Sequence, residues 1–153
     1  MNSNASVSAA SVYRFKDRWI VSPDKRTTAG LVVSSEPFIA LPLDVNNDDL
    51  GSILMKALAL SKSPMPHPVD WKSITAPRLA AAGVKSERTF QLNAALVQVT
   101  CDDQYLTFTP TRNSGAVGES KGFHALPDVA VKTLIGSDAT VGEVLRRAFS
   151  KCS

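Results

Sequence analysis

The chain has 153 residues, of which 44% are hydrophobic and 20% charged, as expected of a globular domain. No apolar run approaches the ~20 residues that span a bilayer, and the N-terminus lacks the basic and apolar segments of a secretory signal. Seventeen basic residues against fourteen acidic ones give a net charge of only +3. A dedicated nucleic-acid-binding domain usually carries a larger and more clustered excess.

We expect residues 1–10 to form a flexible arm and residues 11–153 a single domain. In SVYRFKDRWIVS, apolar residues flank Lys16-Asp17-Arg18, which predicts a pair of strands joined by a turn. LVVSS and PFIALPL add two further β-prone segments. Asn46, Asn47 and Asp48 are N-cap candidates, with acidic side chains at the positive end of the helix dipole. They predict the start of a helix that runs to about Ser61 and buries one apolar stripe.

Three prolines in SKSPMPHPVD predict a linker after that helix. A short helix around Trp71 should follow, with a new helical turn that Pro77 opens and Gly83 ends. The strongest β signal is RTFQLNAALVQVTCDDQYLTFTPTR, with a turn at residues 102–104. A flexible, glycine-rich loop then leads to the strand FHALP and a last helix, for which Thr140 and Glu143 predict a capping box.

One unit occurs twice in the sequence. ALPLDVNNDDLGSILMKAL and ALPDVAVKTLIGSDATVGEVLRRAF each pass from ALP through an acidic turn to a helix with an early glycine. We expect Gly51 and Gly142 to let these helices approach an antiparallel sheet closely. Together the helical and strand periodicities predict an α+β fold, with about three helices packed on one sheet and a helix at the C-terminus.

The search for catalytic or metal-binding motifs gives only weak candidates. His67 and His124 have no partner at metal-ligand spacing, and GAVGESKG lacks the glycine spacing of a P-loop. Adjacent strand residues such as Asp102 and Asp103 point to opposite faces, which argues against an acid–base pair. Asp44, Asp48 and Asp49 lack a calcium-loop pattern and are better explained as helix capping. We therefore expect no cofactor, no metal and no enzymatic activity; an enzyme site around His124 and Cys101 is the remaining alternative.

Four segments, in chain order, carry a resemblance to a known family. They are the acidic turn into LGSILMKALALSKS; a Trp-bearing helix ending in Gly before basic residues and an apolar strand (Trp71, Gly83, Lys85, Arg88, Phe90); the strand pair QVTCDDQYLTFTPT; and the closing VGEVLRRAFSKCS. Together they cover roughly residues 36–153. The chain resembles the CdiI-type immunity proteins of bacterial contact-dependent growth inhibition (CDI) systems.

This resemblance implies a cytoplasmic protein that binds the C-terminal toxin domain of a large CdiA-type effector as a heterodimer. Inhibition would come from blocking the toxin's active site or substrate surface, and the toxin would be a nuclease such as a tRNase. The predicted toxin-binding residues are Asp102, Asp103, Arg112, Glu119 and Lys121, because a hairpin tip and a loop can vary without disturbing the scaffold. No membrane or direct nucleic-acid contact is expected. The alternative is a small nucleic-acid-binding module that uses the basic region Arg14–Arg26.

Overall fold

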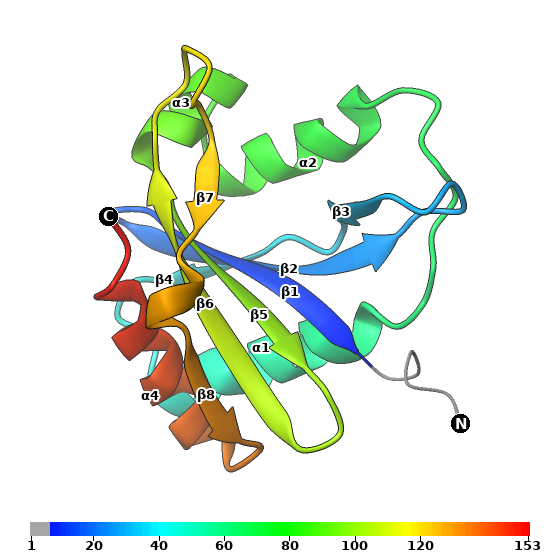
Figure 1. Ribbon diagram of the computed structural model, residues 1–153. Helices are drawn as coiled ribbons and strands as arrows, with labels where there is room; N and C mark the ends of the chain where they lie inside the picture. The colour runs from blue at the N-terminus through cyan, green and yellow to red at the C-terminus, as the bar shows by residue number, and fades with distance from the viewer. Residues whose placement is uncertain (1–6) are drawn as a thin grey trace.

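The computed structural model describes residues 7–153 and shows one α+β domain, as predicted (Figure 1). The strands are β1 (Ser8–Arg14), β2 (Arg18–Arg26), β3 (Val32–Ser34), β4 (Ile39–Pro42), β5 (Ala95–Cys101), β6 (Tyr105–Asn113), β7 (Phe123–Ala125) and β8 (Val131–Leu134). The helices are α1 (Asn47–Leu60), α2 (Lys72–Ala82), α3 (Glu87–Asn93) and α4 (Asp138–Phe149), with a short 3-10 turn, η1 (Pro127–Val129). Over the described residues the helix count is therefore four rather than about three.

All the strand pairs are antiparallel and form one sheet. The order is β3-β2-β1-β5-β6-β7, with β4 also paired to β2 and β8 also paired to β6. The predicted strand pairs β1–β2 and β5–β6 are both present. The predicted N-terminal arm was too long, because β1 begins at Ser8 and Ala10 is fully buried between β2 and β5. Residues 1–6 of that arm lie outside the described residues.

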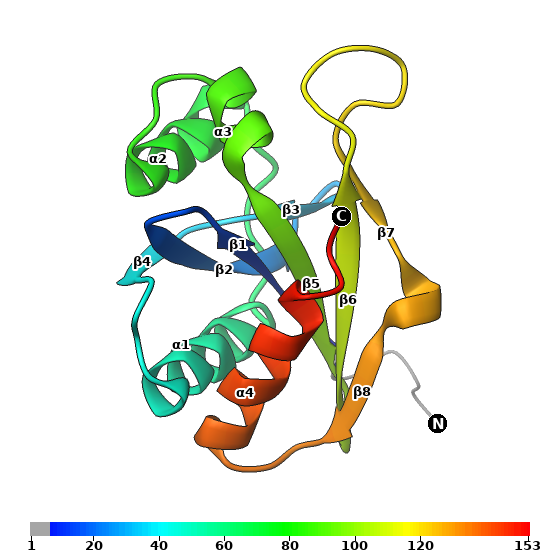
Figure 2. The ribbon, with the colours of Figure 1, turned by 90° about the vertical axis from the view of Figure 1, so that its left-hand side faces the viewer.

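Helices α1 and α4 pack side by side on one face of the sheet (Figure 2). They enclose the larger of two hydrophobic clusters, which contains Trp19, Val97 and Phe108 from the sheet together with Leu54 and Phe149 from the helices. Because strand side chains alternate between faces, Val97 and Val99 enter this cluster while Leu96 points to the other side. The two copies of the repeated sequence unit thus supply the two helices of one layer.

The two early glycines of these helices meet at their crossing, and not at the sheet as the sequence suggested. A Cβ atom built on Gly51 would overlap the carbonyl oxygen of Asp138, and one built on Gly142 would overlap that of Asn47. Asn47 lies four residues before Gly51, and Asp138 lies four residues before Gly142. The contact is therefore reciprocal: each helix places its first turn against the glycine of the other.

Helices α2 and α3 cover part of the opposite face, over a second cluster of Tyr13, Phe15, Ile20, Phe90 and Leu96. Phe90 is the centre of this cluster, with its ring centroid 5.0 Å from that of Tyr13 and 5.1 Å from that of Phe15. In Figure 1 these helices lie across the upper part of the sheet. Below them the same face is open, and the side chains of Gln98 and Thr100 on β5 are exposed.

Three local expectations need correction. Residues 88–93 are helical in α3 rather than the start of a strand, because the Ser86 side chain accepts a hydrogen bond from Thr89 N and caps the helix. Helix α2 is continuous through Pro77, although it ends at Gly83 as predicted. The cap of α4 is Ser137, which accepts from Thr140 N, so the predicted capping box at Thr140 and Glu143 is wrong.

Candidate interaction surface

The tip of the β5–β6 hairpin carries the two predicted acidic residues, and they differ in role. Asp102 Oδ1 accepts hydrogen bonds from the backbone N–H groups of Gln104 and Tyr105, both at 2.8 Å. These bonds lower the pKa of the Asp102 carboxyl below its ordinary value. Asp102 therefore shapes the turn itself. Asp103 is exposed, so its carboxylate is available to a partner.

The β6–β7 loop carries Glu119 and Lys121, and Arg112 precedes it at the end of β6. The loop is closed by hydrogen bonds from Ser114 N to Gly122 O and from Gly122 N to Gly115 O, each at 2.9 Å. Its three glycines have φ values of 87°, 93° and 100°, which favour glycine over residues with a side chain. The charged side chains of all three predicted residues are exposed.

The structure does not bring the five predicted residues together. Asp102 and Asp103 precede β6, whereas Arg112 lies near its end, and the strand from Tyr105 to Arg112 alone spans about 24 Å. In Figure 1 the hairpin tip lies at the bottom and the β6–β7 loop at the top. We call Asp102 and Asp103 the tip group, and Arg112, Glu119 and Lys121 the loop group.

The basic region Arg14–Arg26 is divided in a similar way. Arg14 pairs with Trp19 near the start of β2, whereas Lys25 and Arg26 end that strand, about 25 Å away. Arg14 and Arg146 also lie over the Trp19 ring, at 5.9 and 5.4 Å from its centroid, so their guanidinium groups pack on the core. The region thus offers two small basic areas rather than one continuous stripe.

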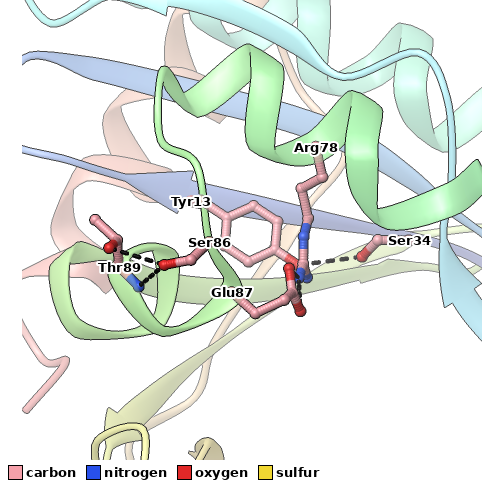
Figure 3. A network of polar contacts seen from close by, with 6 residues as sticks. All are labelled: Tyr13, Ser34, Arg78, Ser86, Glu87 and Thr89. Carbon is pink, nitrogen blue, oxygen red and sulfur yellow. Dashed lines mark hydrogen bonds and ion pairs between the residues drawn. The ribbon is translucent and has the colours of Figure 1, made fainter. Parts of the chain in front are cut away.

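A polar network that the sequence did not reveal joins α2 and α3 to the sheet (Figure 3). Arg78 on α2 donates from Nη2 to both carboxylate oxygens of Glu87, at 2.5 and 2.6 Å, and lies 4.4 Å over the Phe90 ring. The guanidinium of Arg78 also faces the Tyr13 ring, and Tyr13 Oη shares a 3.2 Å hydrogen bond with Ser34 Oγ. This network positions α2, and therefore also the segment that leads into it.

The network continues to Asp24, a carboxylate inside the sheet. It accepts hydrogen bonds from Ser11 Oγ at 2.9 Å and from Ser34 Oγ at 3.1 Å. Burial raises the pKa of Asp24, and these two hydroxyl groups offset only part of that effect. Ser22 faces the same side, opposite Ser11, and its buried Oγ has no partner among the described residues. Asp24 belongs to a structural network that links β1, β2 and β3.

A shallow groove of about 480 Å³ lies between β4 and the start of α1. Its lining includes Asp44 and Asp49, with Leu41 and Ile53 as apolar walls and Lys56 at one side. Asn46, one of the three N-cap candidates, caps α1 by accepting from Asp49 N at 2.7 Å. No group of three or more His, Cys, Asp or Glu side chains in the described chain is arranged to hold a metal ion.

The two histidines and two cysteines lie apart from each other. His67 shares a 3.0 Å hydrogen bond with Thr27 Oγ1, and His124 Nε2 donates to the Ser120 carbonyl. Both thiols are free, and burial raises the pKa of each. Cys101 ends β5, whereas Cys152 Sγ contacts the Leu96 carbonyl near the start of that strand. In the strand register His124 lies opposite Arg112 and Cys101 lies opposite Leu106, and these two positions of β6 are about 20 Å apart. The predicted alternative of a site around His124 and Cys101 therefore gains no geometric support.

Within residues 7–153, no helix combines the length and the apolar character needed to cross a membrane. The fold and these surface features define a small α+β binding domain. Comparison with known sequences then gives its family: residues 8–152 match the family described as CdiI, CDI immunity protein, and the chain belongs to this family. A search of curated proteins finds no match.

Two solved structures share the fold. One is the protein of unknown function NMB0488 from Neisseria meningitidis, with a TM-score of 0.77 and 19% identity over 100% of both chains. The other comes from a CdiA-CT/CdiI toxin and immunity complex from Yersinia pseudotuberculosis, with a TM-score of 0.71 and 20% identity. That match covers 97% of this chain and 99% of the Yersinia chain.

Proposed function

We propose that this protein is a cytoplasmic immunity protein that binds the C-terminal toxin domain of a cognate CdiA-type effector. The observation that carries the proposal is the family match, which spans residues 8–152 and so includes both helix layers and the whole sheet. The fold shared with a chain of a toxin and immunity complex supports it. Protection would come from a stoichiometric heterodimer, without turnover and without a cofactor.

The toxin is proposed to be a nuclease, such as a tRNase, whose active site or substrate surface the immunity protein covers. A standard interface of about 800 Å² per partner is roughly 30 Å across. A single toxin domain could therefore reach both the tip group and the loop group only by lying along β6. Contact with one of the two groups alone needs no such placement, so the groups have to be tested separately.

The experiment measures the affinity of the purified protein for the toxin domain encoded beside its gene, together with survival of cells that produce that domain. Tight one-to-one binding and survival are expected for the wild type. Failure of the wild type in both assays would refute the proposed function. Loss of toxin-catalysed RNA cleavage on adding one equivalent would support the nuclease assignment.

Charge reversal locates the interface. Asp103→Lys tests the tip group without removing the hydrogen bonds of Asp102, and the pair Arg112→Glu with Lys121→Glu tests the loop group. Asp128→Lys on η1 is the matched control, because it reverses an exposed charge outside both groups. At least one test variant should weaken binding tenfold or more. Unchanged affinity in both would remove Asp103, Arg112 and Lys121 from the interface.

A further inference from the structure

An exposed apolar surface lies where the α1–α2 linker passes the β2–β3 hairpin. We define the linker patch as Leu31, Val32, His67, Val69 and Trp71. Val69 is fully exposed, while Leu31, Val32 and Trp71 are 49%, 48% and 43% exposed. In Figure 1 the linker runs along the right-hand edge of the molecule, beside the hairpin that joins β2 to β3.

Hydrogen bonds hold the linker against the hairpin. Met65 N donates to Arg26 O at 3.1 Å, and Thr28 N donates to Met65 O at 3.0 Å. The Thr27 hydroxyl bonds both to the His67 ring and to Leu31 N, and so joins the two halves of the linker patch. The ring of Trp71 then packs edge-on against His67, with 5.5 Å between centroids.

The linker is also stiff, because Pro64, Pro66 and Pro68 restrict its backbone. Its far end is tied to α2, which the Arg78–Glu87 pair anchors to the rest of the fold. The apolar side chains are thus presented in a fixed arrangement, and little conformational entropy is lost when a partner covers them. Exposed apolar surface held in this way, and including a Trp, has the character of an interface hot spot.

Basic residues border the linker patch. Arg26 and Lys72 are exposed beside it, and Lys25 precedes Arg26 on β2. The one acidic residue within the linker is Asp70, and its carboxylate accepts a hydrogen bond from Lys72 N at 2.9 Å, at the start of α2. The border is therefore positive, which favours a partner surface with acidic groups around an apolar protrusion.

We propose that the linker patch is the apolar anchor for the toxin domain, which meets it with an acid-rimmed apolar protrusion. This inference rests on the proposed function, since the toxin is its occupant. The charged tip and loop groups would then set specificity, because rim charges contribute more to association rate and partner choice than to affinity. Trp71 and Val69 would supply the desolvated centre of the interface.

The test uses the toxin domain encoded beside this gene and measures its affinity for Val69→Glu, Trp71→Ala and the control Val129→Glu. Val69 is fully exposed, so its replacement removes no packing within the fold. Val129 is exposed on η1, outside the linker patch. We expect at least a tenfold loss of affinity for the two patch variants and less than a twofold change for the control.

Tryptophan fluorescence gives a second readout, because it reports whether Trp71 is covered in a complex that still forms. Trp19 is buried, so acrylamide quenching of the free protein should come mainly from Trp71. The difference between wild type and Trp71→Phe isolates this signal, and it should fall when the toxin domain binds. Quenching of Trp71 that stays unchanged in the complex would overturn the proposal.

The other outcomes are distinguishable. If Val69→Glu and Trp71→Ala bind the toxin domain as tightly as the wild type does, the linker patch is not the toxin anchor, and the proposed function still stands. No binding by the wild type would refute the proposed function, and the assigned occupant with it. A wild-type dimer that Val69→Glu dissociates in size-exclusion chromatography with light scattering would assign the linker patch to a second copy of this chain.

Discussion

The reciprocal contact of Gly51 and Gly142 makes a strong prediction about stability. In Gly51→Ala the new methyl group would overlap the Asp138 carbonyl oxygen and stand 2.7 Å from its carbon. An ordinary carbon–carbon contact begins near 3.4 Å. The atoms in the way belong to the backbone, so a side-chain rotation cannot relieve the overlap. Helices α1 and α4 must therefore move apart by roughly 1 Å at their crossing.

Two opposing terms set the size of the effect. Overpacking of this kind costs about 1–3 kcal/mol, and a rigid backbone obstacle favours the upper end. Alanine is better than glycine inside a helix by about 1 kcal/mol, which offsets part of the loss. We therefore expect a net loss of about 2 kcal/mol in the free energy of unfolding. In a domain of this size that corresponds to a fall in Tm of about 4–8 °C.

Urea and thermal unfolding followed by circular dichroism would measure this loss. Gly142→Ala should behave alike, because its methyl group would meet the Asn47 backbone, with its carbonyl carbon at 2.9 Å. The double variant should lose less than the sum of the two, since helices already separated by one methyl group accommodate the second. Ser52→Ala, one position along α1, is the control and should be neutral or slightly stabilising. A Gly51→Ala protein as stable as wild type would refute the close reciprocal packing.

Three further effects can be measured in the same assays. Burial raises the pKa of Asp24 above its ordinary 3.8, so the stability that its protonated form contributes is full below that value and is lost as pH rises through the folded-state pKa. Asp24→Asn should therefore gain stability relative to wild type as pH rises from about 3.5 to 7. The opposite trend in urea titrations over this range would contradict the reasoning. Ser137→Ala should lower the free energy of unfolding by about 1 kcal/mol by removing the cap of α4, whereas Glu143→Ala should change it by less than about 0.5 kcal/mol. Equal losses would show that Glu143 takes part in capping this helix. Asp102→Ala should destabilise the hairpin by about 1 kcal/mol while Asp102→Asn retains most of it, because an amide oxygen can accept the same turn hydrogen bonds; equal effects would show that those bonds do not matter.

Features set by neighbouring residues were predictable from sequence. The Asn46 cap, the turn at residues 102–104 and the end of α2 at Gly83 each depend on a few adjacent side chains, and all three are confirmed. Helix α3 was missed because its segment was grouped with the β-prone strand that follows it, although its Ser86 cap is a local signal. The packing of Phe90 between Tyr13 and Phe15 is the part that depends on distant residues. Those partners lie more than seventy positions away in the chain, so no local pattern contains them.

At the candidate site, too, local features were predictable from sequence and contacts between distant residues were not. Asp103 and Lys121 were recognised as exposed because turns and glycine-rich loops are exposed in general. Asp24 gave no signal, since its partners Ser11 and Ser34 come from two other strands and only the strand register brings them together. Trp71 was recognised as part of a helix start, but its contact with His67, which the Thr27 hydroxyl holds against the β2–β3 hairpin, was not predictable from neighbouring residues.

The division of the fold into two faces bears on how such a protein could change its partner. On one face, Gly51 and Gly142 tolerate no side chain without separating α1 from α4, so that layer has little freedom to vary. The linker patch, the hairpin tip and the β6–β7 loop lie outside this crossing, and their exposed side chains make few contacts with the core. Substitutions there would alter the surface offered to a toxin at little cost in stability. A repeated helix unit that fixes the scaffold is therefore compatible with rapid change at the proposed binding surface, because the two depend on different residues.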